Sequence, residues 1–98
     1  LLNLYRNERD SVGWHADDEP ELGPMPLIAS LSLGETRRFR LKPKNKQSPV
    51  KPLSLELPSG SLLLMSGGVQ RYWQHTIPKE SRQMDYRVNL TFRKILAL

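Results

Sequence analysis

Residues 87–93 read Arg-Val-Asn-Leu-Thr-Phe-Arg, and the strict alternation of polar and apolar side chains predicts a β-strand. Successive side chains of a strand point to opposite faces of its sheet, so this segment has one polar and one apolar face. We expect the apolar face, formed by Val88, Leu90 and Phe92, to serve as core. The polar face then either meets solvent or lines a cavity, and the segment alone leaves both interpretations open.

The two arginines that end this segment suit a ligand with two carboxylates. Arg87 and Arg93 would lie roughly 20 Å apart on an extended strand, at about 3.3 Å per residue, so two inward-leaning side chains leave room for a short dicarboxylate. Guanidinium groups bind carboxylates through paired, directional hydrogen bonds, which makes arginine better suited to this task than lysine. Further polar side chains that would complete such a site are Asn3, Tyr5, Asn89 and Thr91.

The rest of the chain also reads as short strands. The turn signal at Gly34-Glu35 favours a hairpin of residues 27–33 with residues 36–42, and we expect residues 61–65 to be a buried strand. Seven or so strands, with turn signals about every 8–12 residues, predict a mainly all-β fold, either an antiparallel barrel or a jelly roll. The other expected strands are residues 1–6, 53–57, 72–77 and 86–95.

A second stretch, Trp14-His15-Ala16-Asp17-Asp18-Glu19, carries a candidate metal site. In an extended segment His15 and Asp17 point to the same side, and His75 is the only other histidine of the chain. Two histidines and one carboxylate form the facial triad of non-haem Fe(II) oxygenases, although a His-x-Asp triplet alone also arises by chance. The chain has no cysteine, which excludes disulfides and zinc-thiolate sites and favours iron or manganese.

Composition bounds the class of protein. The 98 residues are 38% hydrophobic and 26% charged, which predicts one small globular domain. Basic residues gather between residues 37 and 51 in a chain of net charge +5, and this run suits nucleic acid or is a solvated loop. No apolar run approaches the roughly 20 residues of a membrane span, and no signal peptide is recognised. We therefore expect an intracellular monomer with no membrane partner, in the nucleus or cytoplasm of a eukaryote or the cytoplasm of a bacterium.

Taken in order, these motifs resemble the AlkB family of Fe(II)/2-oxoglutarate-dependent nucleic-acid demethylases. The chain looks closest to the animal-type DNA and RNA repair members, which share Asp-Asp-Glu after the histidine. The resemblance implies a double-stranded β-helix, a jelly roll, with residues 1–98 as a single catalytic domain. It also implies that the domain is incomplete at the N-terminus, without the nucleotide-recognition lid. The matching segments are residues 3–5, 15–19, 28–34, 60–63, 73–75 and 87–93.

The resemblance further implies a reaction and a set of site residues. N-methylated bases such as 1-methyladenine and 3-methylcytosine in DNA or RNA would be oxidatively demethylated with Fe(II), O2 and 2-oxoglutarate, releasing succinate, CO2 and formaldehyde. Asp18 and Glu19 would face the damaged base, or Asp18 would instead orient an iron ligand, and Arg71 would contact the substrate. An oxygenase acting on protein or a small molecule, and a non-catalytic jelly-roll binding module, remain the alternatives. Fe(II) would be bound by His15, Asp17 and His75, and 2-oxoglutarate by Asn3, Tyr5, Arg87, Asn89, Thr91 and Arg93.

Overall fold

The structure, a computed structural model, describes residues 1–94 and confirms a mainly β fold. The expected end of the last strand at Ile95 lies outside the described residues. Two short helical segments interrupt the strands, the 3-10 turn η1 (Pro20–Leu22) and the single-turn helix α1 (Val69–Tyr72). The strands are β1 (Leu2–Tyr5), β2 (Val12–His15), β3 (Ile28–Gly34), β4 (Arg37–Pro43), β5 (Leu53–Leu57), β6 (Leu62–Met65), β7 (Trp73–Ile77) and β8 (Arg87–Arg93).

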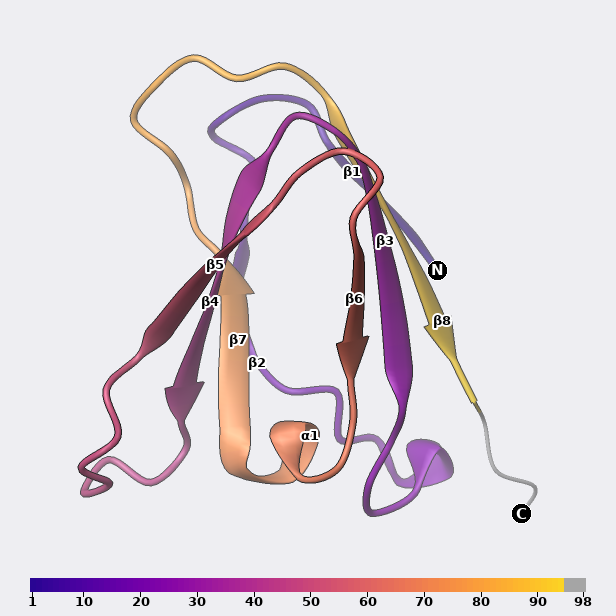
Figure 1. Cartoon of the computed structure of the whole chain (residues 1–98), viewed down its shortest axis with the longest axis vertical. Helices are drawn as coiled ribbons and strands as arrows, with labels where there is room; N and C mark the ends of the chain where they lie inside the picture. The colour runs from indigo at the N-terminus through magenta and orange to yellow at the C-terminus, as the bar shows by residue number, and fades with distance from the viewer. Residues whose placement is uncertain (95–98) are drawn as a thin grey trace.

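The strands form two four-stranded antiparallel sheets, which is the arrangement of a jelly roll. One sheet has the order β1-β8-β3-β6 and the other has the order β2-β7-β4-β5. Figure 1 shows the sheets as the two sides of a wedge, closed at one end and open at the end that carries α1. Within residues 1–94, the structure contains no helix that is long and apolar enough to cross a bilayer.

The predicted hairpin at Gly34 is wrong. β3 pairs with β6 and β8, whereas β4 pairs with β5 and β7, so the chain passes from one sheet to the other at this glycine. Gly34 has a φ of +99°, and a side chain there would collide with the carbonyl oxygen of Tyr86. The Glu35 N–H donates to that same carbonyl at 2.9 Å, which holds the crossing against the start of β8. Gly34 does mark a turn, but the strand that follows it pairs with β5 and β7 instead of folding back on β3.

The expectation that the apolar face of the last strand forms core is also wrong, since its polar face lines the cavity, and β6 is buried only at Met65. Arg87 and Asn89 face the interior, while Phe92 on the opposite face is 59% exposed. Leu62 and Leu64 of β6 are each 60% exposed and lie on the same outer side of this sheet. Alternation separates the two faces of a strand but does not say which one points inward. In β8 the polar face points inward, where its side chains line the cavity described below.

A small apolar core lies between the two sheets. Arg37 is buried beside it and has backbone oxygens in place of a carboxylate: its guanidinium donates to the carbonyls of Asn7, Asp10 and Pro78 at 3.3, 2.9 and 2.7 Å. These bonds tie the loop after β1 to the end of β7 and so close the narrow end of the wedge. The core consists of Tyr5, Ile28, Phe39, Leu57, Met65 and Ile77.

Candidate active site

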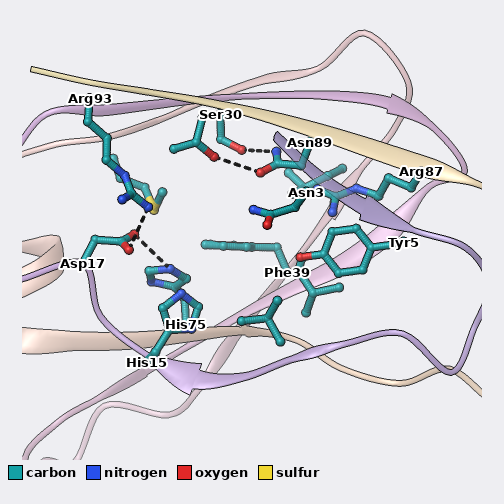
Figure 2. A pocket seen from close by; sticks show the side chains of 15 residues that line it. Asn3, Tyr5, His15, Asp17, Ser30, Phe39, His75, Arg87, Asn89 and Arg93 are labelled. Carbon is teal, nitrogen blue, oxygen red and sulfur yellow. Dashed lines mark hydrogen bonds and ion pairs between the residues drawn. The ribbon is translucent and has the colours of Figure 1, made fainter. Parts of the chain in front are cut away.

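All the residues that we expected to hold the metal and the co-substrate line one cavity. This cavity of about 80 Å³ lies between the two sheets, and Figure 2 shows the side chains pointing into it. The three expected metal ligands, His15, Asp17 and His75, are called the metal-type residues or cluster below, and they lie on or next to β2 and β7 of one sheet. The residues expected to bind the co-substrate lie on β1 and β8 of the other sheet. The shared lining residues are Asn3, Tyr5, His15, Asp17, His75, Arg87, Asn89, Thr91 and Arg93.

The two histidines and the aspartate come together at one end of this cavity. Antiparallel pairing of β2 with β7 places His15 opposite His75, with their ring centroids 4.3 Å apart. A carboxylate oxygen of Asp17 lies 3.6 Å from His75 Nε2. One potential ligand atom from each of the three residues lies within 4.8 Å of the others, a spacing that a single ion can bridge.

Hydrogen bonding and burial leave both imidazoles ready to bind a metal. His15 Nδ1 lies 2.8 Å from the carbonyl oxygen of Gly13, which can only accept, so Nδ1 carries the proton and Nε2 keeps its lone pair. Burial lowers the pKa of His75 to about 4, and the nearby His15 acts in the same direction against the opposing charge of Asp17. His75 is therefore neutral at pH 7, and its 3.6 Å contact with Asp17 is not an ion pair there.

Arg93 fixes the Asp17 side chain from the opposite sheet. Its Nη2 donates to Asp17 Oδ1 at 3.0 Å, and the other carboxylate oxygen faces His75. Asp17 itself is buried, so this charge-assisted bond compensates part of the cost of removing the carboxylate from water. The pair links the last residue of β8 to the metal-type cluster.

The other end of the cavity contains a buried cation without a counter-charge. Arg87 is 1% exposed, and its Nη2 donates to Ser32 Oγ at 2.9 Å. Its Nε and Nη1 are buried and have no hydrogen-bond partner within residues 1–94. The guanidiniums of Arg87 and Arg37 lie 4.9 and 5.5 Å from the centre of the Tyr5 ring, and within residues 1–94 neither of them forms a salt bridge with a carboxylate. A buried guanidinium with unmade hydrogen bonds is costly in isolation and suits an anionic ligand.

Two serines of β3 belong to this site and were missed in the sequence. Ser32 accepts from Arg87, and Ser30 Oγ accepts from the amide of Asn89, whose Oδ1 in turn accepts from Thr91 Oγ1 at 3.0 Å. Both serines are buried and alternate along an otherwise apolar strand. That alternation was the available signal, because it predicts a polar inner face opposite β8.

The residues that we expected on the substrate side lie outside this cavity. Asp18 and Arg71 line a separate hollow of about 250 Å³. Lys44 also lines it, and Lys44 Nζ lies 3.4 Å from the Asp18 carboxylate. Glu19 is exposed and precedes the 3-10 turn, where its carbonyl oxygen accepts from the Leu22 N–H at 3.0 Å. The structure therefore brings Asp18 and Arg71 together but leaves Glu19 apart from them.

Comparisons with known proteins agree with this site. Residues 1–93 match the 2OG-Fe(II) oxygenase superfamily. The chain is 50% identical to human alpha-ketoglutarate-dependent dioxygenase alkB homolog 3, over 97% of this chain and 35% of that protein. It is 44% identical to human DNA oxidative demethylase ALKBH2, over 98% of this chain and 39% of that protein. The Arabidopsis thaliana protein of the same name is 42% identical, over 98% of this chain and 37% of its own length.

The jelly roll, the two-histidine-one-carboxylate cluster and the family match define a class of enzyme, the Fe(II)/2-oxoglutarate-dependent dioxygenases. The chain belongs to the 2OG-Fe(II) oxygenase superfamily. Within it, the relatives bear out the AlkB-type resemblance that the sequence motifs indicated. The chain spans a little over a third of the length of these relatives, so what the whole proteins do is carried to it only as a proposal.

The neutral state of His75 predicts a pH dependence of folding. An unfolded histidine binds a proton below about pH 6.5, whereas folded His75 does so only below about pH 4. The contribution of His75 to stability is therefore complete above about pH 6.5 and is lost as the pH falls toward 4. Urea unfolding of the metal-free chain across this window should show the decline. A His75→Leu variant should show a shallower decline, by up to about 1.4 kcal/mol per pH unit, and equal slopes would contradict the buried, neutral His75.

Proposed function

We propose that this protein oxidatively demethylates N-methylated bases in nucleic acid, using Fe(II), O2 and 2-oxoglutarate. The observation that carries the proposal is a single cavity with a two-histidine-one-carboxylate cluster at one end and a buried, unpaired guanidinium at the other. The substrate class comes from the relatives, two of which are named DNA oxidative demethylases.

The metal-type cluster fits Fe(II). His15, Asp17 and His75 offer two imidazoles, of which His75 is neutral at pH 7, and a carboxylate within reach of one ion, a set that leaves positions for other ligands. Bound iron with 2-oxoglutarate and O2 would supply the oxidising power for hydroxylating an N-methyl group, which is then lost as formaldehyde. The protein's share is to fix the ligands, hold the co-substrate and keep water out of a narrow cavity.

The guanidinium end fits a carboxylate of 2-oxoglutarate. We assign Arg87 and Tyr5 to one carboxylate, because Nε and Nη1 of Arg87 are buried without hydrogen-bond partners, and Figure 2 shows Arg87 at the opposite end of the pocket from the two histidines. Arg93 lies beside Asp17 and would serve the end of the co-substrate nearest the metal. The remaining polar contacts are assigned to Asn3, Asn89 and Thr91.

The hollow next to the metal-type cluster is the proposed substrate side. Bases such as 1-methyladenine and 3-methylcytosine carry positive charge, and Asp18, with a side chain 64% exposed, offers a negative charge at this surface. Lys44 and Arg71 line the same hollow and would contact phosphate. A stacked base cannot reach the cavity, so the substrate must be single-stranded or have its base flipped out. Glu19 would contact the substrate only at the rim, given its exposed position.

The basic run supports a nucleic-acid partner, but with fewer free cations than the sequence suggests. Arg37 is buried and bound to backbone carbonyls, and Arg38 pairs with Glu80 at 3.0 Å. Apart from the buried Arg37, the cations of the run without a carboxylate partner in the described part of the chain are Arg40 and Lys42, which lie over the Trp14 ring, and Lys46 and Lys51. This face would add salt-dependent affinity for phosphates.

We further propose that the protein is an intracellular monomer and acts in the nucleus or cytoplasm, where nucleic-acid substrates are found.

Two assays test this function. The first is anaerobic addition of Fe(II) and 2-oxoglutarate, which should produce a visible charge-transfer absorption band. The second measures formaldehyde and succinate release with an oligonucleotide carrying 1-methyladenine or 3-methylcytosine, against the unmethylated oligonucleotide and a methylated peptide. We expect formaldehyde only with the methylated oligonucleotide. If the absorption band does not appear, the proposed binding of Fe(II) and 2-oxoglutarate is wrong. If formaldehyde is released only with the methylated peptide, the substrate is protein and not nucleic acid.

A further inference from the structure

Gln70 is the most deeply buried amide side chain in the described part of the chain, and no motif pointed to it. It lies on α1 with 1% of its surface exposed. Its Oε1 accepts from the backbone N–H of Asp17 at 2.8 Å, and its Nε2 lies 3.4 Å from Met65 Sδ. The amide orientation follows from the chemistry, because an N–H donor needs the oxygen and not the NH2 group.

The hydrogen bond from the Asp17 N–H to Gln70 holds a segment of backbone that belongs to no strand or helix. β2 ends at His15, so Asp17 lies in a segment without strand or helix assignment, and pairing of the sheets cannot fix its backbone. Arg93 holds the side chain of Asp17, but an ion pair at one carboxylate oxygen leaves the main chain free to move. Gln70 supplies the missing main-chain bond. The helix that carries Gln70 leads directly into β7, which carries His75.

We propose that Gln70 is a positioning residue for the iron centre, and that its side-chain amide sets the distance between the aspartate and histidine ligands. This inference rests on the proposed role of Asp17 as a metal ligand. One amide joins two segments far apart in sequence: the loop after β2, which supplies Asp17, and the helix α1, which leads into the strand that supplies His75. Loss of the bond would leave the fold and both imidazoles intact but release the carboxylate.

The competing explanation is that Gln70 only fills space beneath α1. Two variants separate these roles. Gln70→Met keeps the length and approximate volume of the side chain but cannot accept from the Asp17 N–H as an amide oxygen does. Met65→Leu removes the sulfur partner of Gln70 and alters packing at the same place, while leaving the bond to Asp17 in position. A packing role predicts similar effects from both changes, and a positioning role predicts an effect only from the first.

The experiment is a titration of the full, metal-free chain with Co(II), followed by its visible absorption. Gln70→Met should weaken metal binding by about 10–100-fold, and Met65→Leu should leave it near that of the unmodified protein. Thermal unfolding without metal reports whether each variant is folded. Gln70→Asn, whose oxygen falls short of the Asp17 N–H, gives a second test and should show the same loss if Gln70→Met does not fold.

At saturating Fe(II), the KM for 2-oxoglutarate should not change in Gln70→Met, because Arg87 and Tyr5 are untouched. Unchanged Co(II) affinity in folded Gln70→Met, or an equal loss in Met65→Leu, would overturn the positioning role. Failure of the unmodified chain to bind any metal would instead overturn the proposed function, so the two failures are distinguishable.

Discussion

Replacing Asp17 with alanine is expected to abolish metal binding and turnover. Asp17 is the only carboxylate of the cluster, and its removal leaves two imidazoles with no anionic ligand. It also leaves the Arg93 guanidinium beside the histidines without its partner at 3.0 Å, so a repelling cation replaces an attracting anion. Both changes act against a divalent ion in the same place. Titration with Co(II) and formaldehyde release should both fall to background.

The chain contains its own matched control for this change. Asp18 is the next residue, carries the same side chain and is largely exposed, with Lys44 as its partner. Asp18→Ala should retain metal binding and raise the KM for a methylated oligonucleotide, since Asp18 is assigned to the substrate side. Normal turnover in Asp17→Ala would refute the triad. Loss of metal in Asp18→Ala would mean that the wrong carboxylate of the pair has been assigned to the ion.

The sequence predicted the site better than the strand pairing, and the reason is physical. Side-chain alternation and residue type decide which residues share a face, so Arg87, Asn89, Thr91 and Arg93 were grouped correctly. Which face turns inward depends on the opposite sheet, and an apolar run such as β6 gives no information about that. The same limit explains the Gly34 error, because a turn signal marks where the chain bends and not which strand it next pairs with.

Gln70 shows a different limit. A helix of four residues has too few positions for a periodic pattern, so nothing in residues 66–72 distinguished this glutamine from a surface residue. Its role follows only from the contact with Asp17, which is far away in the sequence. The buried serines of β3 could have been predicted, because their alternation with apolar residues is visible in the sequence.

Arg87→Met is expected to produce opposite effects on stability and on co-substrate binding. The unmodified chain keeps a buried guanidinium with two unpartnered nitrogens, close to a second buried cation, Arg37. Burial lowers the pKa of Arg87, and the charge of Arg37 acts in the same direction, while Tyr5 opposes them. Replacing a buried ionic group with an apolar side chain of similar volume is often neutral or stabilising. The melting temperature of Arg87→Met without 2-oxoglutarate should therefore rise.

The same change should remove most of the affinity for 2-oxoglutarate. Truncating one partner of a buried charge pair costs about 2–5 kcal/mol, so the KM should rise by roughly 30- to 5,000-fold. Arg93→Ala should also raise the KM for 2-oxoglutarate. This change would not isolate co-substrate binding, because Arg93 holds Asp17 and its loss disturbs the metal site as well. Metal binding should survive in Arg87→Met, since its guanidinium makes no contact with the three metal-type residues.

Arg82→Met is the matched control for Arg87→Met, since the Arg82 side chain is 66% exposed and, within residues 1–94, its one salt bridge is to Glu35 at 3.4 Å. That exposed pair contributes little to stability, and the variant should neither gain stability nor lose co-substrate affinity. Addition of 2-oxoglutarate with Mn(II) should raise the melting temperature of the unmodified chain and of Arg82→Met but not that of Arg87→Met. A fall in the melting temperature of Arg87→Met without co-substrate would mean that Arg87 is a structural cation, satisfied by Ser32 and Tyr5. Its unpaired donors would then be no guide to a carboxylate site.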